Sequence, residues 1–200
     1  MRRLLPLLLV LALSCTAGAT IIFDNLGGSS NGVDTIAGFG PLSDSFSTGA
    51  NGFSLTEVGL KMEDIGTPTG SFTIELLADN NINPGNPIYT IATVQDSSLT
   101  NSLQDYFFTL SQSQLLAPNT RYWIGLSSTD NSVAYWSWTV DTSGVGVDGE
   151  YFANQNGVFT NNNGAYQMQI SGDVVPEPGT LLTMGTGMVG LLGVLRRKLG

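Results

Sequence analysis

Carboxylates are the side chains in this sequence that could act as acids, bases or metal ligands. The chain holds sixteen Asp and Glu residues and no His. Without His, a Ser-His-Asp triad, a His zinc site and a His general base are excluded. A glycoside hydrolase needs two carboxylates about 5–10 Å apart across a cleft, and no spacing in this sequence pairs two of them. We therefore expect no catalytic residues and no enzymatic activity.

Two loops rich in Asp and Asn are the candidate metal sites. Calcium takes six to eight oxygen ligands, and residues 79–83 and 141–150 supply such oxygens. Neither loop has the EF-hand pattern, and the same residue types are common in ordinary turns. Calcium is therefore the metal that these loops would bind if they bind one, and no other cofactor is expected.

A pair of aromatic residues is the candidate glycan contact. Residues 121–127 and 133–140 alternate as two strands around a short loop, and symmetric pairing puts Trp136 and Trp138 on the core face. The same pairing puts Trp123 and Tyr135 together on the outer face, where exposed rings can stack on sugars. The alternative is that a neighbouring loop covers them, since aromatic residues are common in strands.

The elements that must position these residues are strands. Gly accounts for 25 of the 200 residues and charged residues for only 12%, which excludes a helix bundle. Asn-Gly pairs at Asn31, Asn51, Asn156 and Asn163 predict turns with positive φ. Alternating apolar segments predict strands at 20–24, 44–48, 53–63, 71–78, 88–94, 105–110, 121–127, 133–140, 150–153 and 165–171.

These strands predict an all-β domain over residues 20–173, with the architecture of a β-sandwich or jelly roll. Residues 27–37 and 154–164 are expected to be long loops, the second with two Asn-Gly hairpins, and the prolines of 83–87 predict a further loop.

The basic residues lie mostly at the two ends of the chain. Only Lys61 and Arg121 lie between Asp24 and Glu177, the span that contains all sixteen acidic residues. Nucleic-acid binding requires clustered Lys and Arg, so a nucleic-acid partner is excluded.

Residues 1–19 are typical of a signal peptide. Arg2 and Arg3 precede an apolar stretch over residues 4–13, and Ala17 and Ala19 form an A-x-A cleavage site. The export translocon and signal peptidase are the implied partners. Cys15 raises the alternative of a lipoprotein, but Leu13 stands one place out of the usual register for lipidation.

The C-terminus predicts a membrane anchor. Residues 179–195 form a run of seventeen residues without a charge, and a helix of that length rises about 25 Å, the short end of a membrane span. Residues 174–178 form a Pro-Glu-Pro linker before it. The basic tail over residues 196–200, with Arg196, Arg197 and Lys198, is expected to stay cytoplasmic. The simplest interpretation is a tail anchor.

The order of Pro176, Glu177 and Pro178, a Gly-rich apolar span and a terminal basic cluster resembles the PEP-CTERM sorting signal. This resemblance implies recognition near the Pro-Glu-Pro triplet by a membrane-embedded exosortase. It also implies a Gram-negative bacterium that makes extracellular polysaccharide. The resemblance covers residues 175–199.

The middle of the chain resembles the choice-of-anchor extracellular domains, most closely type R. The resemblance rests on the order of short motifs, among them Phe23–Gly27, Phe53–Val58, Phe72–Leu76 and Leu116–Ile124, followed by Trp136-Ser137-Trp138. It implies a surface-displayed module and transfers no catalytic residues.

These observations together predict an exported, surface- or matrix-anchored protein without enzymatic activity, associated with extracellular polysaccharide. The alternative functions are a carbohydrate-binding module that uses Trp123 and Tyr135 and, less in keeping with the sequence, a secreted glycan hydrolase.

Overall fold

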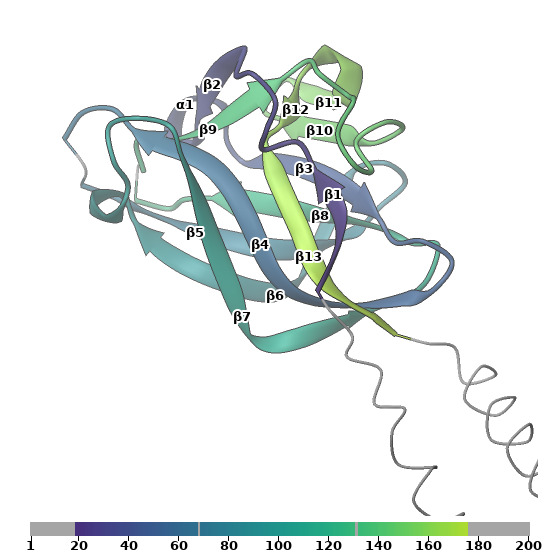
Figure 1. Ribbon diagram of the computed structural model, residues 1–200. Helices are drawn as coiled ribbons and strands as arrows, with labels where there is room; N and C mark the ends of the chain where they lie inside the picture. Colours follow the sequence, from purple (N-terminus) through teal and green to yellow (C-terminus); the bar gives the residue numbers. More distant parts are fainter. Residues whose placement is uncertain (1–18, 68, 131, 176–200) are drawn as a thin grey trace, which may run out of the picture.

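The domain is a sandwich of two antiparallel sheets. The computed structural model describes residues 19–67, 69–130 and 132–175. The first sheet has seven strands in the order β1-β13-β4-β9-β12, with β7 paired to β4 and β2 paired to β9. The second has six strands in the order β11-β10-β3-β8-β5-β6. In Figure 1, strands β7, β4 and β13 of the first sheet lie side by side in front of the second sheet.

The strands are β1 (Thr20–Asp24), β2 (Gly32–Thr35), β3 (Leu42–Ser47), β4 (Gly52–Asp64), β5 (Ser71–Asp79), β6 (Pro84–Gln95), β7 (Gln104–Leu116), β8 (Arg121–Ser127), β9 (Ala134–Thr139), β10 (Tyr151–Asn154), β11 (Gly157–Thr160), β12 (Ala165–Tyr166) and β13 (Met168–Val175). The described residues also contain three short helical turns: α1 (Ile36–Phe39), η1 (Asp96–Ser98) and η2 (Asn161–Asn163). The all-β sandwich predicted from the alternation of apolar residues is confirmed.

The core lies between the sheets and is built by that alternation. On β4, Val58, Leu60 and Met62 are fully buried, and on the facing sheet Ile124 and Leu126 of β8 are fully buried as well. Burial of each such side chain stabilises the fold by about 1.5–3 kcal/mol.

Two strands were not expected. The predicted loop 27–37 contains β2, and the predicted loop 154–164 contains β11, which pairs with β10 across Asn156-Gly157. In two of the four Asn-Gly pairs the Gly has a positive φ, at Gly157 and Gly164. In the other two pairs the Gly is the first residue of a strand: Gly32 begins β2 and Gly52 begins β4.

The expected loop at 83–87 is largely strand. β6 begins at Pro84, and its first residues pair irregularly with β5. Proline is tolerated there because β6 is an edge strand of the second sheet. On an edge strand, the N–H that a proline lacks can be one that would have pointed to solvent.

The predicted hairpin between residues 121–127 and 133–140 is wrong. β8 belongs to the second sheet, between β3 and β5, whereas β9 belongs to the first, beside β4. The intervening loop crosses between the sheets, and it is held to β5 where Asp130 accepts hydrogen bonds from Ser71 N and Oγ at 2.9 and 2.8 Å. The core-facing sides were predicted correctly, since Ile124 and Trp136 are buried, but they face each other across the sandwich.

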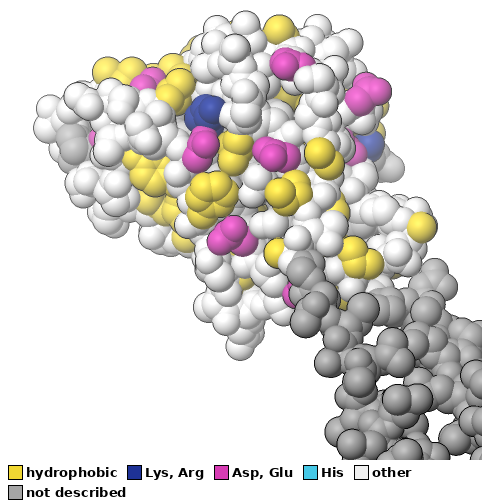
Figure 2. All heavy atoms as spheres, in the orientation of Figure 1, with side chains coloured by type: hydrophobic (Ala, Val, Ile, Leu, Met, Phe, Trp, Pro, Cys, Tyr) yellow, Lys and Arg dark blue, Asp and Glu magenta, His cyan; other side chains and the backbone are white. Residues whose placement is uncertain are grey.

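Figure 2 shows the molecule from the side of the first sheet. Hydrophobic side chains lie among Asp and Glu side chains on this face, largely in separate groups. Phe107 of β7 is half exposed and lies against Gly59 of the neighbouring β4, where a Cβ would stand 2.8 Å from its ring. Lys61 of β4 lies 3.6 Å from Asp105 of β7.

Candidate functional site

The two ends of the described domain leave the sandwich side by side. Thr20, the first residue of β1, pairs with Gly172 of β13, and Ala19 before it is exposed. β13 pairs with β4 as far as Val175, two residues beyond the predicted domain end at residue 173. The expected linker at 174–178 therefore begins inside the last strand, and Pro176 follows that strand directly.

Most of the predicted sorting residues lie outside the described residues. These are Ala17 of the cleavage site, the triplet Pro176, Glu177 and Pro178, the span over residues 179–195 and the basic cluster Arg196, Arg197 and Lys198. Across residues 19–67, 69–130 and 132–175, no helix has both the length and the apolar character needed to cross a membrane.

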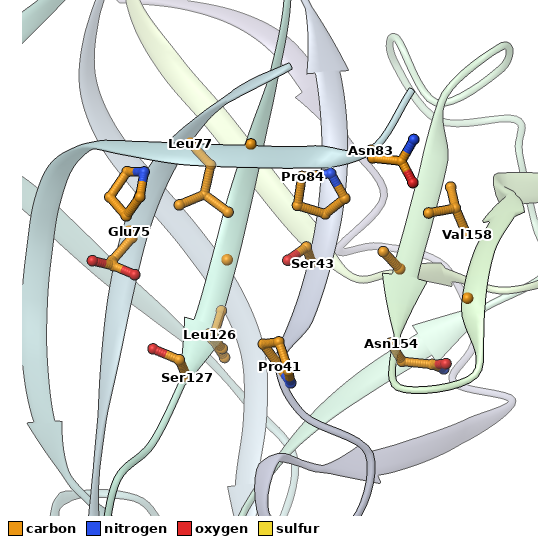
Figure 3. A pocket seen from close by; sticks show the side chains of 15 residues that line it. Pro41, Ser43, Glu75, Leu77, Asn83, Pro84, Leu126, Ser127, Asn154 and Val158 are labelled. Atoms are coloured by element: carbon orange, nitrogen blue, oxygen red, sulfur yellow. The ribbon is translucent and has the colours of Figure 1, made fainter. Parts of the chain in front are cut away.

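A groove of about 550 Å³ crosses the outer face of the second sheet. A single row of paired residues forms its base and runs over five strands: Val158, Ala153, Ser43, Gly125 and Glu75. Figure 3 shows Glu75 on one side of the groove and Asn154 and Val158 on the other. Prolines from β6 and from the segment before β3 lie at its margins.

Gly125 allows close packing at the base of the groove. A Cβ at this position would lie 2.7 Å from Leu77 Cδ1 and 3.3 Å from Ser43 Oγ. Leu77 therefore leans over the glycine and narrows the groove.

The polar groups of the groove can form hydrogen bonds. Among the described residues that line it, Glu75 is the one titratable side chain, beside Ser43, Asn83, Ser127 and Asn154. Glycoside hydrolysis uses two carboxylates, and the lining supplies one.

The structure contradicts the predicted glycan contact. Trp123 is 0% exposed on the outer face of the second sheet, where it packs with Leu77 and Ala153. Its Nε1 donates a hydrogen bond to Asp79 Oδ1 at 2.9 Å. Tyr135 lies on β9 in the first sheet and is only partly exposed. The two rings therefore lie on different sheets and form no shared platform.

The two tryptophans predicted to be core residues differ in burial. Trp136 is fully buried, stacks on Tyr166 with ring centroids 4.7 Å apart and donates from Nε1 to the carbonyl of Gln167. Trp138 is only partly buried and packs against the core from its margin.

Two carboxylates of the predicted calcium loops, Asp79 and Asp141, already have protein partners. Asp79 accepts from Trp123 Nε1 and from Ile82 N, and Asp141 accepts from Ser143 N. The hydrogen bond from Ser143 lowers the pKa of Asp141. Across the part of the chain that the structure describes, no group of three or more His, Cys, Asp or Glu residues is arranged to hold a metal ion.

Glu150, at the end of the second predicted calcium loop, is 5% exposed and held by three donors. Arg121 Nε lies 2.8 Å from Oε2, Ser45 Oγ donates to the same oxygen at 2.5 Å, and Ser47 donates to Oε1. The sequence contained one signal for this cluster, because Arg121 is one of two basic residues between Asp24 and Glu177. That Arg121 pairs with Glu150 could not be predicted from spacing, because the other two residues that hold Glu150 come from β3.

Asp44 is a buried carboxyl that the sequence did not single out. It is 0% exposed on the core-facing side of β3, and it accepts from Tyr166 N at 2.6 Å and from Asn161 Nδ2 at 3.1 Å. Burial raises the pKa of Asp44 well above its ordinary value, and the charge of Glu150 adds to this effect. The alternation along the predicted strand puts Asp44 on the same face as Phe46, so this signal could have indicated a buried Asp.

In the comparison with protein families, residues 174–198 match the PEP-CTERM protein-sorting motif. The chain thus carries this motif, and its first two residues are the last two of β13. The motif indicates an exported protein that is sorted through the membrane to the cell surface and processed by an exosortase-type membrane enzyme. It says nothing about the resemblance to choice-of-anchor domains. Comparison with curated proteins finds no match to the chain.

Proposed function

We propose that this chain is a non-enzymatic protein that an exosortase anchors at the cell surface or in the extracellular polysaccharide matrix of a Gram-negative bacterium. The observation that carries the proposal is the sorting motif at residues 174–198, which follows the sandwich without an intervening spacer. A surface-displayed domain of the choice-of-anchor kind is the role that fits this arrangement.

The absence of a catalytic role is supported by the chemistry of the side chains. The chain has no His, and Glu75 is the single titratable residue among the described residues of the groove. Display therefore requires only that the sandwich folds outside the cell and stays attached through its C-terminal signal.

Deletion of residues 176–200 tests the anchoring role. Because β13 ends at Val175, the deletion leaves every described strand intact, and the domain is expected to appear folded in the medium. A truncated chain that remains in the membrane fraction would contradict the proposal.

A second variant separates exosortase sorting from simple tail anchoring. Replacement of Pro176, Glu177 and Pro178 by Ala keeps the apolar span and removes the triplet. We expect this variant to accumulate in the inner membrane as the longer, unprocessed form, whereas the wild-type chain is shortened at its C-terminus, as measured by intact mass. If both chains end at the same C-terminal residue, once the mass of the substitutions is subtracted, a simple tail anchor is favoured.

A further inference from the structure

The groove on the outer face of the second sheet has the dimensions of a ligand site. Its volume is about 550 Å³, and ligand sites are typically clefts of about 300–1,000 Å³ that combine apolar side chains with a few polar groups. Leu77 and Val158 are apolar side chains in this groove, and prolines lie at its margins. The polar groups of the lining therefore decide which class of ligand the groove fits.

Ser43 is a buried polar group in the groove without a protein partner. The residue is 3% exposed, and its Oγ would stand 3.3 Å from a Cβ added at Gly125, so the hydroxyl lies beside this glycine on the groove side of the sheet. Figure 3 shows Ser43 between Glu75 on one side and Val158 on the other. Most buried side-chain polar atoms have a hydrogen-bond partner, yet Ser43 Oγ forms no hydrogen bond with any residue that the structure describes. This hydroxyl is thus free to bind a ligand.

Glu75 and Ser127 add two further polar groups to the groove. Within the described parts of the chain, neither side chain forms a hydrogen bond with another residue. Gly125 stands between Ser43 and Glu75 in the row of paired residues, and neighbouring strands are about 4.8 Å apart, so the backbones at Ser43 and Glu75 are about 10 Å apart. A hydroxyl both donates and accepts, and a carboxylate has two acceptor oxygens. The three groups therefore suit a ligand that presents several hydroxyl groups along its length.

The charge of the groove favours an uncharged ligand. No Lys or Arg is among the described residues that line it, and the Glu75 carboxylate repels anions. The basic residues of the sandwich, Lys61 and Arg121, form ion pairs with Asp105 and Glu150. An acidic ligand would therefore find no counter-charge in the groove.

The pairing of the sheet argues against an extended peptide. Such a peptide binds through main-chain hydrogen bonds to the free edge of a sheet. Along the base of the groove, however, strands β10, β3, β8 and β5 each have a neighbouring strand on both sides. The groups left for a ligand there are mainly side-chain oxygens and apolar surface.

We propose that this groove binds a segment of a neutral polysaccharide. The sugar hydroxyl groups donate to Glu75 and exchange hydrogen bonds with Ser43 and Ser127, while the apolar C–H faces of the rings pack on Leu77 and Val158. Five strands at this spacing extend over about 19 Å, so the groove accommodates a chain of several sugar rings.

The proposed site differs from the aromatic pair predicted from the sequence, because Trp123 is fully buried against Leu77 and Ala153 and offers no ring to a sugar. The proposal does not depend on the sorting function, since the groove belongs to the folded sandwich. A chain whose groove binds no glycan would still be sorted.

Calorimetric titration of the full chain tests the proposal. The chain is purified in a detergent without a sugar headgroup and titrated with linear tetrasaccharides of glucose, mannose, galactose and xylose. We expect at least one of these neutral probes to bind, and a tetrasaccharide of galacturonic acid to bind at least about tenfold more weakly because Glu75 repels it. Absence of binding by all four neutral probes refutes the proposal, as does tighter binding of the acidic probe.

Two variants locate the binding in the groove. Glu75→Gln keeps the shape of the side chain but removes a charged acceptor and is expected to weaken binding about tenfold, and Ser43→Ala is expected to weaken it about fivefold. Glu57→Gln, on β4 of the other sheet, is the matched control and is expected to leave the affinity unchanged. Thermal unfolding followed by tryptophan fluorescence checks that each variant is folded. Unchanged affinity in both groove variants would place the glycan elsewhere, and binding of a proline-rich peptide that is lost in Glu75→Gln would assign the groove to a protein partner; either result overturns the proposal.

Discussion

The ion pair between Arg121 and Glu150 allows a quantitative test of the fold. Arg121 Nε lies 2.8 Å from Glu150 Oε2, and the two side chains are 23% and 5% exposed. The guanidinium also donates to the carbonyl of Gly149 at 3.3 Å and lies 4.9 Å from the centre of the Tyr151 ring. This pair therefore ties the segment before β10 to the outer face of the second sheet.

Arg121→Met keeps the apolar stem of the side chain and removes its charge. Breaking a buried pair costs about 3–5 kcal/mol because the remaining charge has no counter-ion. The two Ser hydroxyls on Glu150 and the partial exposure of Arg121 favour the lower end, about 3 kcal/mol. For a domain of this size that loss lowers Tm by about 6–12 °C.

Glu150→Gln should cost less, about 1–2 kcal/mol, because the exposed part of Arg121 can be hydrated. In the double variant no buried charge remains. We therefore expect a total cost well below the sum of the single changes, with a coupling of at least about 1.5 kcal/mol.

Thermal unfolding of the four chains, followed by tryptophan fluorescence at pH 7, measures this cycle. Asp105→Asn is the matched control, since it breaks the more exposed ion pair with Lys61. The side chains of that pair are 19% exposed at Lys61 and 42% exposed at Asp105. It should cost no more than about 1 kcal/mol. Additive losses in the cycle, or a loss for Arg121→Met no larger than that of the control, would refute the reasoning.

Two further predictions concern the last strand and the core. Gly172→Ala would put a Cβ 2.0 Å from Ser54 O, so we expect it to lower the free energy of unfolding by about 3 kcal/mol and to speed amide exchange over residues 172–175. Gly49→Ala is the control: a Cβ there has nothing within 4 Å, and the change should leave stability unaltered. Because the pKa of Asp44 is raised in the folded state, its contribution to stability is full below its unfolded value of about 3.9 and is lost as the pH rises through the folded value. The test compares the Tm of wild type with that of Asp44→Asn across a range of pH, with Glu150 and Tyr166 unchanged. As the pH rises, Tm should fall more for wild type than for the variant. A difference in Tm that stays constant with pH would contradict a raised pKa for Asp44.

Side-chain alternation was enough to predict which faces of most strands are buried. It could not predict strand partners, because a period of two residues is the same whether a face packs across a hairpin or across a sandwich. The loop that crosses between β8 and β9 forms hydrogen bonds with Ser71 and Asp96, which lie far from residues 128–133 in sequence. Only the folded chain brings these residues together.

The prediction for Trp123 failed for a related reason. The alternation correctly placed its ring on the outer face of β8, but an outer face is exposed only if nothing packs on it. Leu77 and Ala153 cover this ring, and Asp79 accepts its N–H from 44 residues away. By contrast, the sorting signal was recognised from sequence because its three parts are contiguous and need no fold to be read.

The scarcity of basic residues explains why most buried carboxyl groups of the domain are not stabilised by an ion pair. With two cations between Asp24 and Glu177, only Glu150 among the buried acids that the structure describes has an Arg partner, and that partner is itself partly exposed. At Asp44 burial instead raises the pKa, which favours the protonated form more than in an exposed Asp, and Asp96 is satisfied by three donors. Asp64 has one buried oxygen without a donor, and burial together with the charge of Asp96 raises its pKa as well. Protonation of such groups draws on the medium, so the stability of an exported domain of this kind depends in part on the pH outside the cell.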